Sequence, residues 1–302
     1  MTAYLVATLA LVAISTIAGL ALNLQWGLGG LVNFGLFGFV MLGAYTCGLL
    51  NVAGWPPLVA MAAAILVTAA ASAAVSLISI RLSDDYLAIV SLGFAESLRL
   101  FISYEEWLTR GTLGVPGIVR PFTGWVPPAA ADAVFLAFAV ACLALVYAVF
   151  EKLARSPFGR TLRATRDDPT VAEALGKNVL WLRLRAFGIG GAALGIAGSL
   201  HAFNYTYIDP TQFGPVITAY AFMAVIIGGR GSNTGVLLAG FTVVLLLEGS
   251  RFLIDAFGLL DGARLAALRL LLVGVALVAI LIFKPDGLVR EYRLTSAAKE
   301  GP

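Results

Sequence analysis

Charged residues are scarce in this sequence, most of all at its start. From Met1 to Ile80 there is no Asp, Glu, Lys, Arg or His, and the 302-residue chain is 60% hydrophobic and 12% charged. A typical soluble domain is about 25% charged, and a soluble chain this apolar would expose large apolar patches. Apolar segments of about 20 residues, long enough to cross a bilayer, recur along the chain. These features predict an integral membrane protein.

The expected fold class is all-α. Runs such as AMAAAILVTAAASAAVSLISI lack the alternation of polar and apolar positions that a membrane β-barrel needs. The pattern predicts a polytopic protein of eight to ten transmembrane helices embedded in the lipid bilayer. The individual spans are expected near Tyr4–Leu24, Gly30–Leu50, Leu58–Ile80, Tyr86–Tyr104, Ala133–Phe150, Arg185–Phe203, Phe213–Gly228, Thr234–Leu253 and Leu265–Phe283.

Cysteine and histidine are also rare, which argues against several chemistries. Cys47 and Cys142 both lie in apolar runs, so they are interpreted as small buried side chains rather than a disulfide. His201 is the only histidine and has no companions for a metal site. No G-x-x-x-x-G-K-[ST] phosphate loop occurs, and no nucleophile–base pair stands out. The chain is therefore not expected to be an enzyme, to use a cofactor or to hydrolyse ATP by itself, and no basic stripe for nucleic acid is present.

The second apolar segment, GLGGLVNFGLFGFVMLGAY, is rich in glycine. One interpretation is a face of small residues that lets helices approach closely. The other is a broken or re-entrant helix beside a substrate path, as in many transporters. Under the second interpretation the candidate pathway residues of this segment are Asn33, Gly38, Gly43 and Tyr45.

The stretch SPFGRTLRATRDDPTVAEALGKNVLWLRLR (156–185) is an arginine-rich island between apolar spans. Lys and Arg gather in loops on the cytoplasmic side of a membrane, so residues 151–185 and the basic tail 284–302 are both expected there. An even number of spans separates them, so the two assignments agree. Residues 105–132 then form an external loop.

The island also carries the signature of a short capped helix. Asp168 can cap its start, Pro169 suits the first position, and Gly176 suits the left-handed position after its end. Val171 and Leu175 are four residues apart and so share a face, and Phe158 and Leu162 repeat that spacing. A loop that only fixes topology does not need such order, so docking of a cytoplasmic partner is the favoured interpretation.

Two pairs of ionisable residues lie within expected spans. Glu96 and Arg99 are three residues apart, and Glu248 and Arg251 repeat the pattern. Charges at depth mark candidate functional sites, so these four residues are candidates for an outer vestibule or gate. The competing interpretation is local pairing within each helix, with the arginine reaching towards the interface.

Five regions of the chain, in order, resemble one family. The island contains S-x-x-G-R-x-x-R-A-x-R and A-E-A-L-G, followed by Ala186-Phe187; the other regions are GFVMLGAY, DYLAIVSLGFAESLRL with TRGTLGVPGI, IIGGRGSNTGVLLAG and IFKPDGLV. These motifs are similar to those of ABC-importer permeases for branched-chain amino acids, specifically the LivM type of the LivH/LivM family.

The resemblance implies a single permease domain, residues 1–302, in a bacterial inner membrane. It implies two cytoplasmic ATP-binding subunits, a homologous second permease and an external substrate-binding protein as partners. Branched-chain amino acids are the implied substrates, with urea or short amides as alternatives. The residues implied for coupling to the ATPase are Phe158, Arg160, Leu162, Arg163, Arg166, Asp168, Pro169, Val171, Glu173, Ala174, Leu175 and Gly176.

Other classes of function stay open at this stage. A stand-alone secondary transporter or channel could use Glu96 and Glu248 as ion sites. An intramembrane enzyme acting on lipids would need a polar catalytic cluster that the sequence does not offer. A membrane scaffold without a pathway is the third alternative.

Overall fold

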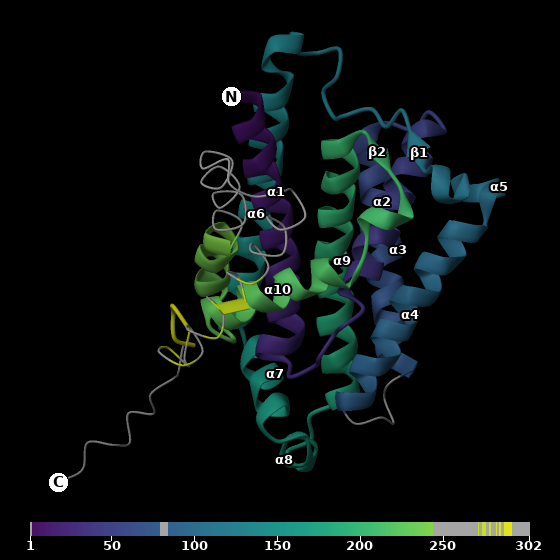
Figure 1. Cartoon of the computed structure of the whole chain (residues 1–302). Helices are drawn as coiled ribbons and strands as arrows, with labels where there is room; N and C mark the ends of the chain where they lie inside the picture. Colours follow the sequence, from purple (N-terminus) through teal and green to yellow (C-terminus); the bar gives the residue numbers. More distant parts are fainter. Residues whose placement is uncertain are drawn as a thin grey trace.

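The structure is a computed structural model that describes residues 2–78 and 84–243, and residues 271, 274–275, 278, 282, 284 and 287–291 beyond them. The described chain is almost entirely helical (Figure 1). Its only sheet within these residues is a two-stranded ladder. The expected all-α class is therefore confirmed.

Six helical segments in the described residues are long and apolar enough to cross a membrane. They are Tyr4–Leu28, Pro57–Leu77, Tyr86–Tyr104, Ala131–Arg155, Val179–Tyr205 and Pro210–Gly228. Two shorter apolar helices, Leu36–Val52 and Asn233–Val243, accompany them. The predicted span Leu265–Phe283 lies almost wholly outside the described residues, as does most of the segment after Val243.

The centre of the bundle is built from α1 (Thr2–Leu22), α2 (Leu36–Val52), α3 (Pro57–Ile78) and α9 (Val179–Tyr205). Helix α9 lies between the others (Figure 1). In its most apolar stretch, 72% of the residues are buried. Small residues allow this close packing: a Cβ on Gly191 would meet Ser72 and the Thr68 carbonyl of α3, and one on Gly195 would meet the backbone of Ile65.

Helices α4 (Asp84–Tyr104), α6 (Ala131–Arg155) and α10 (Pro215–Gly228) surround this centre. Helix α4 packs on α2, whereas α6 and α10 pack on α1. All three expose large apolar side chains, such as Ile89, Leu145 and Val216. Such faces suit contact with lipid or with another membrane subunit.

The glycine-rich second segment contains both a break and a packing face. Helix α1 runs on as a π-helix, η1 (Asn23–Leu28), and α2 begins only at Leu36, so residues 29–35 are not helical. The predicted span Gly30–Leu50 therefore starts six residues too early. Gly30 has φ +75°, a left-handed conformation that glycine adopts without steric cost. After the break, Gly38 lies against Ala95 and Gly43 against Gly195.

At one end of the bundle, the segment between α4 and α6 folds over the other helices. It contains α5 (Glu106–Thr109), η3 (Gly111–Leu113), β1 (Val115–Pro116) and η4 (Pro128–Ala130). β1 pairs antiparallel with β2 (Tyr207–Ile208), Val115 opposite Ile208. β2 leads through η5 (Pro210–Gln212) into α10.

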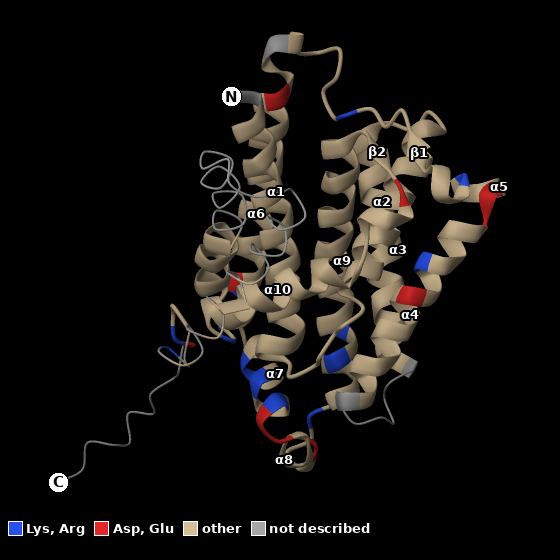
Figure 2. Cartoon of the chain, in the orientation of Figure 1, with Lys and Arg blue, Asp and Glu red and all other residues tan. Residues whose placement is uncertain are grey.

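The opposite end of the bundle carries α7 (Pro157–Asp167) and α8 (Pro169–Ala174). Figure 2 shows the basic residues of α7 and the start of α9 gathered at this end, beside the acidic residues near α8. We call it the basic end of the bundle, and we call the end with α5 and the β-ladder the ladder end.

Candidate functional site: the basic end and the broken helix

Helix α8 has the caps that the sequence predicted. Asp168 Oδ1 accepts hydrogen bonds from the N–H groups of Thr170 (2.9 Å) and Val171 (3.0 Å). Pro169 is the first helical residue, and Gly176 has φ +75°. Helix α7 starts in the same way, because Ser156 Oγ accepts from the N–H of Gly159. The island is therefore an ordered pair of helices.

The apolar residues of the two helices face in different directions. Val171 and Leu175, at α8, are 54% and 73% exposed, and Ala174 beside them is exposed as well. Leu162 of α7 is fully buried, and Phe158 is partly buried against the core. Leu162 thus anchors α7 to the bundle, although it shares the apolar spacing of the pair at α8. Only the pair at α8 is well exposed for a partner.

The arginines of the island are divided in the same way. Arg160 is exposed, whereas Arg166 reaches into the bundle. Arg166 Nη1 donates to the Gly27 carbonyl of η1 at 2.5 Å, and its guanidinium binds both oxygens of Glu291 at 3.1 and 3.2 Å. Arg163 lies 3.8 Å from the same carboxylate and donates to the Ala154 carbonyl. These two arginines therefore hold α7 against other parts of the same chain and are not free for a partner's groove.

The pKa values of two arginines at this end are shifted in opposite directions. Burial opposes the charge on Arg166, but hydrogen bonds and attraction from Glu291 and Asp167 outweigh it, so the pKa of Arg166 is raised. Burial, followed by repulsion from Arg166, lowers the pKa of Arg230. The Arg230 guanidinium lies over the Trp26 ring, 5.1 Å from its centroid, in a cation–π contact. Both arginines thus touch η1.

A chain of amides joins η1 to the glycine-rich loop after α10. Asn23 Oδ1 accepts from the Gly231 N–H, and Asn23 Nδ2 donates to Asn233 Oδ1, both at 2.9 Å. Asn233 Nδ2 in turn donates to Glu151 Oε2 of α6 at 3.1 Å. Sequence reasoning noted the loop GGRGSNTG but missed Asn23, Glu151 and Glu291, because polar residues so far apart in sequence give no local signal of a shared contact.

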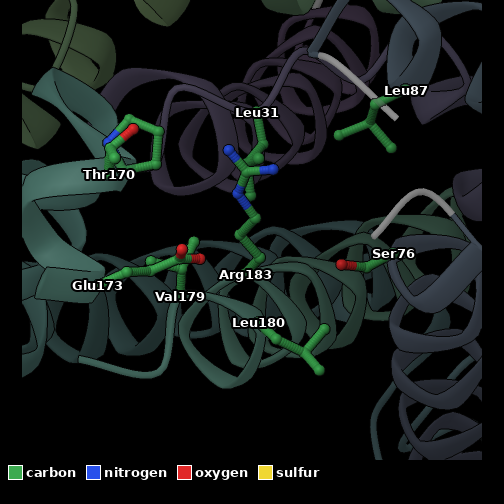
Figure 3. A pocket seen from close by; sticks show the side chains of 9 residues that line it. Leu31, Ser76, Leu87, Thr170, Glu173, Val179, Leu180 and Arg183 are labelled. Atoms are coloured by element: carbon green, nitrogen blue, oxygen red, sulfur yellow. The ribbon is translucent and has the colours of Figure 1, made fainter. Parts of the chain in front are cut away.

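A cavity of about 260 Å³ separates α8 from the broken segment. In Figure 3 the side chain of Arg183, from α9, extends into this space towards Leu31 of the break. Glu173 of α8 lies on its wall beside Val179. Glu173 is exposed, so this predicted coupling residue is open to solvent at the mouth of the cavity.

The broken segment holds a buried polar cluster. Asn33 Nδ2 donates to Gln25 Oε1 at 2.8 Å, and Gln25 and Ser72 share the Phe187 carbonyl of α9. Asn33 is fully buried, and its Oδ1 has no hydrogen-bond partner among the described residues. The Tyr45 hydroxyl is likewise buried without a partner there. Buried polar atoms are normally paired, so these two predicted pathway residues have unused hydrogen-bonding capacity.

The Glu96–Arg99 pair forms the local ion pair that the sequence allowed. Arg99 Nε donates to Glu96 Oε2 at 3.0 Å, and a second bond joins Arg99 Nη2 to Glu96 Oε1. Their side chains stay 41% and 30% exposed. Glu248 and Arg251 lie outside the described residues. His201 contacts Gln212 at 3.2 Å, and no group of possible metal ligands occurs in the part of the chain that the structure describes.

The structure is a bundle of apolar helices with a broken helix, and it carries the ordered helices α7 and α8 at its basic end. Such features are typical of a membrane transport subunit. Residues 4–281 match the family described as branched-chain amino acid transport system / permease component. The chain belongs to this family of membrane permeases, as the sequence motifs predicted.

The relatives agree with this placement. The chain is 32% identical over 286 residues to the high-affinity branched-chain amino acid transport system permease protein LivM of Salmonella typhimurium, which covers 86% of this chain and 64% of that protein. It is 34% identical over 223 residues to the probable LivM permease of Methanocaldococcus jannaschii, with 70% and 62% covered. An autoinducer 2 import system permease protein, LsrC, of Escherichia coli is 31% identical over 60% of this chain and 55% of its own length.

The alignments with the two LivM relatives thus span just under two thirds of those proteins. No solved structure matches the chain.

Proposed function

We propose that the chain is the membrane-spanning subunit of an ATP-driven importer for branched-chain amino acids, or for related small amino acids, urea or amides. The observation that carries this proposal is the capped helix α8, which offers Val171 and Leu175 to the outside at the basic end of the bundle. Exposed apolar side chains on a short ordered helix suit insertion into a groove of a partner, and exposed Arg160 supplies charge to orient it.

In this proposal the basic end faces the cytoplasm of a bacterial inner membrane. Lys152 and Arg155 at the end of α6, Arg160 of α7 and Lys177 after α8 lie there, and an excess of Lys and Arg marks the cytoplasmic side. The tail 284–302 falls on the same side, and 105–132 with its β-ladder lies outside. Residues 1–302 form one permease domain.

The proposed partners follow from this orientation. Two separate ATP-binding subunits dock at the basic end, since this sequence has no phosphate loop of its own. A homologous second permease completes the pathway, and an external binding protein delivers substrate to 105–132. LivM and LivH permeases both occur among the relatives.

Within the permease we place the pathway near the break before α2. Asn33, Gly38, Gly43 and Tyr45 remain its candidate residues, with Glu96 and Arg99 on the neighbouring helix and Glu248 and Arg251 further along the chain. The unpaired oxygens of Asn33 and Tyr45 support this placement, because a state that opens the break would let them bind water or substrate.

The docking proposal is tested with the intact importer, co-expressed with its ATP-binding subunits and binding protein. We expect Val171→Asp with Leu175→Asp to abolish co-purification of the ATP-binding subunits and ATP-dependent leucine uptake, because a charge cannot enter an apolar groove without a partner. Lys152→Asp, on the exposed end of α6, is the control for the added negative charge. Full co-purification of the double variant would exclude α8 as the docking element.

The Glu96–Arg99 ion pair argues against the alternative of a secondary transporter. Glu96 is engaged with Arg99 rather than available as a lone proton site. Uptake by the purified chain alone, driven by a proton or sodium gradient and indifferent to ATP, would favour this alternative over the importer.

A further inference from the structure

A groove lies between α4 and the segment that joins β2 to α10. Its volume is about 470 Å³. The wall that precedes α10 is formed by Thr211, Phe213, Gly214 and Pro215, of which Pro215 is exposed and Phe213 is buried. The α4 wall carries Leu92, Glu96 and Arg99. A ligand pocket in a protein typically measures about 300–1,000 Å³, so the groove has the size of a small-molecule site.

The position of the ion pair within the apolar span of α4 argues against contact of this wall with lipid. Glu96 is twelve residues from Asp84 and eight from Tyr104, the two ends of the helix, which corresponds to about 18 and 12 Å along the axis. Charged side chains so far from the helix end are costly against hydrocarbon. Arg99 does not reach out to the interface, because both its Nε and its Nη2 turn back to Glu96. The partial exposure of the pair therefore opens to a polar space.

We propose that this groove is a binding site for a zwitterionic α-amino acid on its way through the permease. The inference rests on the proposed transport function and adds the site. Glu96 would receive the ammonium group, Arg99 the carboxylate, and Leu92 with Pro215 the branched side chain.

The ion pair gives this site charge complementarity at both ends of the ligand. A carboxylate binds the planar fork of arginine in a bidentate way, and Glu96 Oε1 and Oε2 can accept from an ammonium. The ligand must compete with the existing Glu96–Arg99 bonds, so its affinity is modest. Weak binding is required of a site that a substrate must leave as well as enter.

The test uses a single cysteine in the groove of the intact importer. Leu92 is 39% exposed, and Leu92→Cys is made in a background where the buried Cys47 and Cys142 are replaced by alanine. A water-soluble thiosulfonate labels the purified complex in lipid nanodiscs. We expect millimolar L-leucine to slow labelling at least threefold, whereas isocaproate, which lacks the ammonium, and isoamylamine, which lacks the carboxylate, do not.

Two further variants separate a binding role from a structural one. Glu96→Gln in the same background should remove the protection by leucine, whereas Ser97→Ala, on the exposed adjacent position of α4, should keep it. The double exchange Glu96→Arg with Arg99→Glu preserves an ion pair but exchanges the positions of its two charges. A leucine whose side chain contacts the apolar wall would then meet each charge with the wrong end, so protection should still be lost.

The outcomes distinguish this site from the transport function. If the complex with Leu92→Cys imports leucine with ATP but leucine does not slow its labelling, or if the exchanged pair protects as well as the original, the proposed zwitterion site is wrong and the proposed importer function stands. If the complex imports no branched-chain amino acid and leucine gives no protection, both the proposed site and the proposed substrate are wrong.

Discussion

At the residue scale, Arg166 connects three parts of the chain that are distant in sequence. Its side chain is only 16% exposed and binds Glu291, which is 19% exposed. It also binds the carbonyl of Gly27, next to the break. A movement of α7, caused by a bound ATPase, would thus pass through one guanidinium to the broken helix.

Arg166→Ala should therefore uncouple transport from ATP hydrolysis. We expect leucine uptake per ATP hydrolysed to fall at least tenfold, because the substitution leaves Gly27 and Glu291 without their donor. Arg166 and Glu291 are partly buried, so we expect a loss below the roughly 3–5 kcal/mol that breaking one side of a fully buried ion pair costs. The unfolding temperature is therefore measured as well. Arg166→Lys should recover stability better than coupling, since an ammonium cannot reproduce the bidentate geometry. Unchanged stoichiometry in a well-folded Arg166→Ala importer would contradict this.

Gly30 and Gly176 show how the same backbone conformation can have different costs. Both have φ +75°, and a non-glycine residue there costs roughly 1–2 kcal/mol. A Cβ on Gly176 would meet nothing within 4 Å, whereas a Cβ on Gly30 would come 2.9 Å from Cγ of Arg166.

We therefore expect Gly30→Ala to destabilise the protein clearly more than Gly176→Ala. Thermal unfolding of the two purified variants, compared with the unsubstituted chain, measures the difference. Equal losses would mean that Arg166 moves aside at little cost and is not fixed by Glu291.

At the scale of elements, features that depend on neighbouring residues could be predicted from the sequence, whereas features that depend on distant contacts could not. The caps of α8 were predictable because Asp168, Pro169 and Gly176 act on neighbouring backbone groups. The apolar spacing of Phe158 and Leu162 could not reveal that α7 turns Leu162 inwards, because burial depends on where the rest of the bundle lies.

The break before α2 was predictable only as an alternative. Glycine serves both close packing and irregular backbone, and this segment uses it for both. The Glu96–Arg99 contact was predictable from its spacing, but its groove was not, since half of the groove comes from residues 211–215.

The cap of α8 gives a prediction that belongs to the element. Asp168→Ala removes the acceptor for two N–H groups and should loosen α8 by about 1 kcal/mol. We expect a severalfold weaker affinity for the ATP-binding subunits, measured by titration in detergent, with no change in the unfolding temperature of the bundle. Asp168→Asn, which can still cap, should behave nearly as the unsubstituted chain. An equal loss in both variants would point to the charge of Asp168 rather than to the cap.

At the scale of the whole molecule, α9 is one of the helices that connect the two ends. It begins at Val179, capped by Asn178 beside α8, and continues for 27 residues to Tyr205, about 40 Å. Its far end is held by Arg120 of the ladder end, which donates to the carbonyls of Phe203 and Asn204, both at 2.9 Å. The segment at the ladder end and the helices of the basic end thus both contact α9.

Arg120 should therefore be needed for the external loop to act on the ATPase. The same guanidinium pairs with Asp132 at 2.6 Å and lies 5.2 Å from the Phe135 ring centroid, so Arg120→Ala removes these side-chain contacts of the loop with α9 and α6. We expect faster hydrogen exchange in residues 115–124, and a loss of the ATPase stimulation caused by the substrate-loaded binding protein, while basal hydrolysis is kept. Arg120→Lys retains the charge but cannot reach two carbonyls and a carboxylate at once, so it should restore little. If stimulation survives although exchange is faster, the signal does not pass through this end of α9, and the bundle must transmit it by another helix.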